Sequence, residues 1–225
     1  MQNISPDIIC TEDGSATLIH PVYRDTYHST RGAVGESEHL FIDNGLKKIN
    51  KKNIKILEIG FGSGLNALVT LKYLNDNGLN AEYHTVEKYP VSVETIHKTG
   101  YANIFPEYSE AFMELHRSAW NNTIKVTENF SVVKHHKSFP DIELDAIFDI
   151  IYFDAFSPDT QPEMWTQEIF INLFNHTAIN GLLSTYSSKG IVKQNLRAAG
   201  YTVKRLKGAL GKRHMLNAIK ESDGK

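Results

Sequence analysis

The chain reads Ile56-Leu57-Glu58-Ile59-Gly60-Phe61-Gly62-Ser63-Gly64-Leu65-Asn66 where an apolar run gives way to a glycine-rich loop. The run over residues 54–59 predicts a buried strand, and leucines at helical spacing predict that a helix follows, capped by Ser63. Glycines at such a junction let the backbone turn sharply and approach a ligand without a Cβ in the way. In open α/β sheets, ligands bind at the carboxyl ends of the strands. We therefore expect this loop to form part of a binding site.

Strand and helix signals alternate along the rest of the chain. Further strands are expected at residues 82–86, 130–135, 149–153 and 182–186, with helices at 90–98, 107–120, 162–174 and 191–199. This alternation implies right-handed crossovers and a mostly parallel sheet. The last two strands, 202–206 and 214–219, are too close together for a helical crossover and should form an antiparallel hairpin. The expected fold class is α/β: a Rossmann-like sheet of five parallel strands with a terminal hairpin, as in class I S-adenosylmethionine-dependent methyltransferases.

The first fifty residues contain only short structural signals. A turn is expected at residues 11–15, a strand at 17–19, and a helix from about Ser37 to Asn44-Gly45, where a left-handed cap would end it. We therefore divide the chain into an N-terminal arm, residues 1–50, and a main domain, residues 51–225.

Composition bounds the class of protein. The 225 residues are 41% hydrophobic and 22% charged, which is typical of a folded chain and sufficient for one large α/β domain. A single cysteine, Cys10, excludes an internal disulfide and a cysteine-based zinc cage. No apolar run is long enough to cross a membrane, and the first residues lack the features of a signal peptide. We expect a cytoplasmic protein without a membrane partner.

The net charge of −2 predicts no nucleic-acid partner by bulk electrostatics, but the charges are unevenly distributed. Residues 139–168 hold eight acids and no Lys or Arg, whereas residues 189–213 hold eight Lys or Arg and no acid. A basic block of this kind can attract phosphate. By charge alone, a solvated helix face and an exposed hairpin are the better explanation.

The glycine loop fits two kinds of cofactor. The stretch Gly62-Ser63-Gly64-Leu65-Asn66-Ala67 satisfies the G-x-G-x-x-A pattern of nicotinamide enzymes. Glu58, two residues before the first glycine, favours S-adenosylmethionine, because a carboxylate would repel a diphosphate and attract the α-ammonium of that cofactor. Glu87, at the end of the second strand of the main domain, stands where a ribose-binding acid is expected in either class. Both acids could be solvated strand ends, but methyl transfer is the better hypothesis.

A second signal follows the fourth strand, in Ile150-Ile151-Tyr152-Phe153-Asp154-Ala155-Phe156-Ser157-Pro158. The apolar strand delivers Asp154 to the carboxyl edge of the sheet, where it could orient an amine nucleophile and accept its proton. Phe156 offers a face on which a planar base could stack, and Pro158 stiffens the turn. Asp154 could equally cap that turn. Trp165, further along the chain, is by its size expected to be a core residue. Amine methylation by this arrangement requires no metal.

Together these motifs resemble the methyltransferase module of the tRNA 5-methylaminomethyl-2-thiouridine biosynthesis enzymes. The resemblance rests on the glycine loop and on Asp154-x-Phe156-x-Pro158-x3-Pro162-x-Met164-Trp165. It extends to Tyr27-His28-Ser29-x2-Gly32-Ala33-x2-Glu36-Ser37 in the arm and to Gly211-Lys212-Arg213-His214-Met215-Leu216 near the end. It covers nearly the whole chain.

The resemblance implies an S-adenosylmethionine-dependent enzyme that methylates 5-aminomethyl-2-thiouridine at the wobble position of tRNA. It assigns catalysis to Asp154 and implies that the arm packs on the cofactor site. The residues then expected at the cofactor are Tyr27, Ser29, Glu58, Gly60, Gly62, Gly64, Asn66, Glu87 and Ser138. Those expected at the substrate are Phe156, Pro158, Trp165, Lys212 and Arg213. Two-domain relatives carry a flavin-dependent oxidase fused behind this module. Because the present sequence ends at Lys225, we expect no FAD here and a separate FAD-dependent oxidase that acts earlier.

The chain departs from the relatives at two places. It reads His135-His136-Lys137-Ser138 where related methyltransferases often carry Gly-Asp for the adenine amine, so adenine contact falls to Ser138 or a backbone group. The relatives often carry a lysine near the position of Thr160, so we assign no role to this position from the resemblance.

Other functions stay open at this point. A spermidine-synthase-like aminopropyl transferase shares the fold and the strand-end aspartate, and a nicotinamide-dependent oxidoreductase fits the glycine pattern. A non-catalytic RNA-binding module would use the basic block but would leave Glu58, Glu87 and Asp154 without a role. Metal binding is not expected, because the adjacent His135 and His136 would point to opposite faces of a strand.

Overall fold

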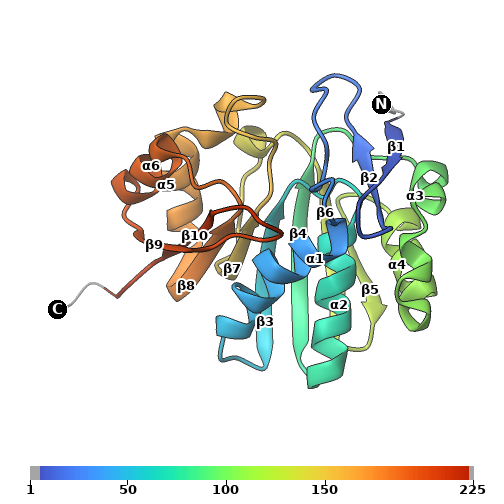
Figure 1. Ribbon diagram of the computed structural model, residues 1–225. Coiled ribbons are helices and arrows are strands. Elements are labelled where there is room, and N and C mark those ends of the chain that lie inside the picture. Colours follow the sequence, from blue (N-terminus) through green and yellow to red (C-terminus); the bar gives the residue numbers. More distant parts are fainter. Residues whose placement is uncertain (1–5, 223–225) are drawn as a thin grey trace.

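The computed structural model describes residues 6–222 and contains one large sheet with helices on both faces (Figure 1). Its eight strands lie in the order β5-β6-β4-β3-β7-β8-β10-β9. Five of them pair in parallel: β6 (Phe130–His136), β4 (Asn80–Glu87), β3 (Asn53–Ile59), β7 (Phe148–Phe153) and β8 (Thr177–Thr185). β10 (His214–Ile219) lies antiparallel between β8 and β9 (Thr202–Lys207). The predicted α/β class and terminal hairpin are confirmed.

The two faces of the sheet pack against different helices, because strand residues alternate between them. On β3, Ile56 belongs to one hydrophobic cluster and Leu57 to the other, and both are fully buried. The first cluster includes residues of the helices α2 (Leu65–Asn77), α3 (Val93–Thr99), α4 (Ser109–Arg117) and α1 (Ala33–Ser37). The second includes residues of α5 (Gln167–Asn175) and α6 (Gly190–Ala198). Among the described residues, no helix combines the length and apolar character needed to cross a bilayer.

Two strands were not predicted from the sequence. β5 (Thr123–Thr127) pairs antiparallel with β6 and extends one edge of the sheet. β1 (Asp7–Cys10) pairs antiparallel with β2 (Ala16–Ile19) in a small separate sheet of the arm. Both strands are short and contain no buried residue, so they lack the long apolar run that reveals a buried strand.

Several helix boundaries differ from those expected; α3 begins at Val93 instead of Pro90, and α4 ends at Arg117 instead of Trp120. The arm helix begins at Ala33 instead of Ser37 and continues as a π-helical turn. No left-handed cap ends it, because Asn44 and Gly45, which follow it, both have negative φ. The helix expected over 162–174 is divided by Thr166, whose hydroxyl accepts the Ile169 amide and begins α5 there. The first residue of α2 follows Gly64, which is left-handed, and Ser63 does not cap it.

The arm passes along the carboxyl ends of the strands and reaches the loop between β9 and β10 (Figure 1). Arg31 Nη1 donates to the Leu210 carbonyl at 2.8 Å, and His39 Nε2 lies 2.9 Å from the Lys207 carbonyl oxygen. The first and last parts of the chain therefore meet beside the same sheet edge.

Candidate active site

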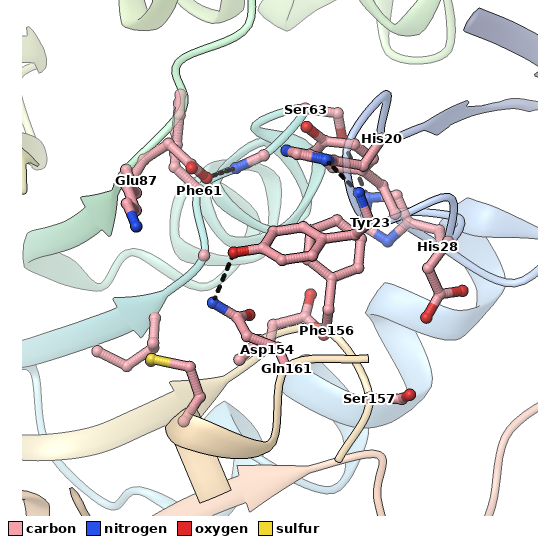
Figure 2. Close-up of a pocket in the computed structure, with 18 of the residues that line it drawn as sticks. His20, Tyr23, His28, Phe61, Ser63, Glu87, Asp154, Phe156, Ser157 and Gln161 are labelled. Atoms are coloured by element: carbon pink, nitrogen blue, oxygen red, sulfur yellow. Dashed lines mark hydrogen bonds between the residues drawn. The ribbon is translucent and has the colours of Figure 1, made fainter. Parts of the chain in front are cut away.

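The glycine loop between β3 and α2 borders a cavity at the carboxyl ends of the strands (Figure 2). The cavity measures about 1140 Å³, including space open to solvent, and residues 20–29 of the arm form one of its walls. Two positions require glycine. Gly60 has a φ of +94°, and a Cβ there would lie 2.8 Å from the Asp154 carbonyl oxygen. Gly62 has a φ of +51°, and a Cβ there would lie 2.7 Å from the Tyr27 ring. The loop is thus packed between the end of β7 and the arm.

Glu87 ends β4 and lines the cavity beside the glycine loop. Its Oε2 accepts the Gly62 amide at 3.0 Å and its Oε1 accepts the Tyr89 amide at 2.7 Å. Burial raises the pKa of Glu87, and these backbone hydrogen bonds act in the opposite direction by stabilising the anion. Glu87 therefore fixes the shape of the loop and presents a carboxylate at the position expected for ribose recognition.

Glu58 is fully buried beneath the cavity and does not line it. Its Oε1 accepts the Asn66 side-chain amide at 3.0 Å and its Oε2 accepts the Thr85 hydroxyl at 2.7 Å. Burial raises its pKa to about 8, and the charge of Asp154 adds to this, whereas the hydrogen bonds from Thr85 and Asn66 oppose it. Glu58 is therefore not a lining residue of this cavity, and its contact with a cofactor stays a prediction.

Asp154 follows β7, lines the cavity and shares Asn66 with Glu58. The Asn66 Nδ2 donates to Asp154 Oδ2 at 2.8 Å and holds the carboxylate at the cavity wall. Burial raises the pKa of Asp154 to about 7, and the hydrogen bond from Asn66 partly opposes this. Asp154 can therefore gain or lose a proton near neutral pH, as a general base must.

Aromatic rings cover the side of the cavity formed by the arm. His20, Tyr23 and Tyr27 of the arm lie with Tyr89 and Phe156, at centroid distances of 4.5–6.4 Å. Figure 2 shows Tyr23 reaching Gln161 across the cavity, where its hydroxyl accepts the amide at 3.4 Å. These rings offer flat faces to planar ligands. Tyr27 and Phe156 were expected here from the sequence, whereas His20, Tyr23 and Tyr89 were not. Four aromatic or imidazole residues within positions 20–28 could have indicated His20 and Tyr23.

The remaining predicted residues divide into two groups. Ser29, Asn66, Ser138 and Lys212 line the cavity, whereas Gly64, Pro158, Trp165 and Arg213 do not. Trp165 is 3% exposed and its indole N–H donates to the Phe156 carbonyl at 2.8 Å, so it supports the wall from the core. Thr160 donates to Asp25 of the arm at 2.9 Å and ties the loop after β7 to the arm.

The histidines of the cavity wall are uncharged at neutral pH. Burial lowers the pKa of His28 to about 4, and its Nε2 lies 3.0 Å from the Ser63 hydroxyl. Ser63 thus anchors the arm to the glycine loop, which explains why it does not cap α2. Burial also lowers the pKa of His20. Within residues 6–222, no three His, Cys, Asp or Glu side chains lie together in a way that could hold a metal ion.

The cavity fits S-adenosylmethionine in three respects: a glycine loop without Cβ atoms, a carboxylate at the end of β4 and flat aromatic faces. A family model described as "S-adenosyl-L-methionine-dependent methyltransferase" matches residues 96–221. The chain belongs to this family. A methyltransferase of this family is an enzyme that uses S-adenosylmethionine, so the nicotinamide-dependent and non-catalytic hypotheses are no longer favoured.

Curated relatives of this methyltransferase are about 30% identical to it over most of this chain. The chain is 31% identical over 224 residues to the tRNA 5-methylaminomethyl-2-thiouridine biosynthesis bifunctional protein MnmC of Cupriavidus metallidurans, covering 92% of this chain and 33% of that protein. It is 32% identical over 211 residues to the protein of the same name from Campylobacter fetus, covering 91% and 34%. The chain therefore spans about a third of the length of these relatives.

Solved structures agree with the fold of the methyltransferase. MNMC2 from Aquifex aeolicus superposes with a TM-score of 0.76 at 27% identity, covering 98% of this chain and 72% of that one. Spermidine synthase from Thermotoga maritima superposes with a TM-score of 0.55 at 11% identity, covering 100% and 72%. At that identity the second likeness shows the fold alone.

Replacement of Glu58 should change how stability depends on pH. Because its pKa of about 8 in the fold lies above the usual 4.5, the fold holds the proton more tightly than the unfolded chain does. Its contribution is therefore present at low pH and is lost at about 1.4 kcal/mol per pH unit as the pH rises toward 8. Glu58→Gln keeps a neutral group and should lose this dependence in thermal denaturation between pH 5 and 9. Glu94→Gln, on the exposed face of α3, is the control, and melting curves that shift in parallel for wild type and Glu58→Gln would contradict the buried proton.

Replacement of Glu87 should weaken cofactor binding. Glu87→Gln removes a charge that holds two backbone amides and faces the ribose position, at a cost of about 2–3 kcal/mol, or roughly 30–150-fold in affinity. Calorimetric titration with S-adenosylmethionine measures this directly. Glu82→Gln is the matched control, because that carboxylate lies on the same strand but pairs with His84 and Lys55. Equal affinity of both variants for S-adenosylmethionine would mean that Glu87 does not contribute to cofactor binding.

Proposed function

We propose that this enzyme methylates the primary amine of 5-aminomethyl-2-thiouridine at the wobble position of tRNA. The observation that carries the proposal is Asp154, a carboxylate of raised pKa held at the cavity wall next to the glycine loop. The names of the relatives support it, since they give 5-methylaminomethyl-2-thiouridine as the product, and its amine methyl is the group that a methyltransferase would add.

Proton transfer to Asp154 is the step that this chain supplies. An aminomethyl group arrives mainly as an ammonium, which has no lone pair for attack. Ionised Asp154 attracts the ammonium and accepts one proton, which leaves a neutral amine. S-adenosylmethionine supplies an electrophilic methyl group on its sulfonium. The amine lone pair then forms the new N–C bond while the C–S bond breaks, and the positive charge passes to the methylated nitrogen. Asp154 finally returns its proton to solvent.

Desolvation makes Asp154 suited to this step. Its raised pKa gives it a stronger affinity for protons than an exposed aspartate, while about half of it is still ionised near pH 7. Asn66 keeps one carboxylate oxygen engaged, which orients the other toward the cavity. Orientation of this kind lowers the entropic cost of bringing the amine and the base together.

We also propose the cellular context of the reaction. The relatives are described as bifunctional, which supports a flavin-dependent oxidase that acts earlier and supplies the aminomethyl group. A tRNA substrate places the enzyme in the cytoplasm. Aminopropyl transfer is the alternative with the same fold, and the two are distinguished by offering the enzyme tRNA that lacks this modification or a polyamine acceptor.

Replacement of Asp154 tests the proposal. Asp154→Asn should bind S-adenosylmethionine as wild type does but methylate tRNA roughly 10²–10⁴-fold more slowly, because the proton acceptor is lost. In the wild type, the rate should rise with pH and level off above about 7, as Asp154 ionises. Asp159→Asn, on the same loop but exposed, is the control. A fully active Asp154→Asn would return Asp154 to the role of a turn cap.

The basic block should contact tRNA phosphates, with Lys207 in place of Lys212 beside the predicted Arg213. Lys212 is paired with Glu36, whereas Arg213 and the Lys207 side chain on β9 are exposed. Lys207→Ala combined with Arg213→Ala should weaken tRNA binding and reduce the slope of log affinity against log salt by roughly 1–2, since each phosphate contact releases about one counterion.

The matched control is Lys52→Ala combined with Lys55→Ala. These exposed lysines lie at the start of β3, away from the cavity at its carboxyl end. Cofactor affinity should not change in either double variant. If both double variants bind tRNA with the wild-type salt slope, the basic block is only a solvated surface.

A further inference from the structure

One ion pair in the cavity wall has no part in the steps above. Lys212, in the loop between β9 and β10, places its Nζ 2.5 Å from Oε1 of Glu36 on α1. The two residues are 176 positions apart in the sequence, and both line the cavity. Neither the glycine loop nor the motif around Asp154 contains them.

Glu36 is held on both sides. Its side chain is 8% exposed, and its second oxygen accepts the Ser29 amide at 2.7 Å. Lys212 is 42% exposed and lies 5.3 Å from the centre of the Tyr186 ring. The Tyr186 hydroxyl donates to the Ala155 carbonyl at 2.9 Å, directly after Asp154. The pair thus connects the arm, the hairpin loop and the segment that carries Asp154.

Two hydrogen bonds to backbone carbonyls already join the arm to the hairpin loop, through Arg31 with Leu210 and His39 with Lys207. A buried carboxylate is costly, and its ion pair is a poor means of holding two segments together when such hydrogen bonds suffice. What the ion pair adds is charge, placed in the wall that Asp154 faces.

We propose that Glu36 and Lys212 are positioning residues of the acceptor site, whose opposite charges balance each other in front of Asp154. This inference rests on the proposed function of Asp154 as proton acceptor. With both residues present, the arm and the hairpin loop contribute almost no net charge, and Asp154 keeps a proton affinity suited to neutral pH. Loss of either one leaves its partner's charge uncompensated.

The other groups around Asp154 do not provide this balance. On the β3 side, Glu58 is largely protonated at neutral pH, and the arm's His28 is neutral. Tyr186, on the β8 side, keeps its proton because burial raises its pKa. Glu87, Asp25, Lys88 and Lys137 line the same cavity. In contrast, the Glu36 carboxylate raises the pKa of Asp154 and the Lys212 ammonium lowers it.

The test compares two variants that each remove one charge. Glu36→Gln should lower the pKa of Asp154 and Lys212→Met should raise it, each by roughly 0.5–1 unit at the effective dielectric of a protein surface. The double variant should return close to the wild-type value, and Lys212→Arg should retain it. The measurement is the ¹³C-carboxyl shift of Asp154 against pH in aspartate-labelled protein, with Asp154→Asn to assign the signal. The pH midpoint of tRNA methylation should move in the same directions.

Glu94→Gln and Lys98→Met, which separate an exposed Glu–Lys pair on α3, are the matched controls. If Glu36 and Lys212 only fastened the arm, both variants would lose stability or cofactor affinity together without opposite shifts of the Asp154 signal, and the inference would be wrong. The titration needs no substrate. Opposite shifts in an enzyme that does not methylate tRNA would therefore support the electrostatic role and count against the proposed function alone.

Discussion

The amide group of Asn66 is the interaction on which the site depends. Its two N–H bonds go to Glu58 on β3 and to Asp154 after β7, while its backbone belongs to the first turn of α2. One side chain therefore fixes the relative position of two neighbouring parallel strands and the helix between β3 and β4. Two buried anions at one donor would repel each other, which favours protonation of one of the two carboxyl groups. Burial raises the pKa of Glu58 and of Asp154, and the hydrogen bond from Asn66 opposes this by stabilising each carboxylate.

The second constraint is that the arm completes the cavity. It contacts the glycine loop through His28 and Ser63, the loop after β7 through Asp25 and Thr160, and the hairpin loop through Arg31 and Leu210. The sheet alone therefore provides only one side of the site. Ordering of the arm costs conformational entropy, and these contacts, with the buried aromatic rings, offset that cost.

The sequence could predict what depends on local pattern. The apolar run before Gly60 and the run before Asp154 identify buried parallel strands, and the ends of such strands lie together in any fold of this type. It could not show which way Glu58 points, because that depends on how α2 packs over β3. It also missed Glu36, whose partner Lys212 lies at the other end of the chain and whose own helix is only five residues long. The resemblance to a known family supplied Tyr27, Ser29 and Lys212 as residues of the site, but not their partners.

The topology has a further consequence at the edge of the sheet. Because β10 lies between β8 and β9, β9 is an edge strand with one row of backbone donors and acceptors unpaired within the sheet. Such a row is a template for pairing with a strand of another molecule. β9 carries Lys204, Arg205 and Lys207, all exposed, and their mutual repulsion opposes alignment of two copies along this edge. The same cations that suit a polyanion thus also protect the protein against aggregation through its open strand.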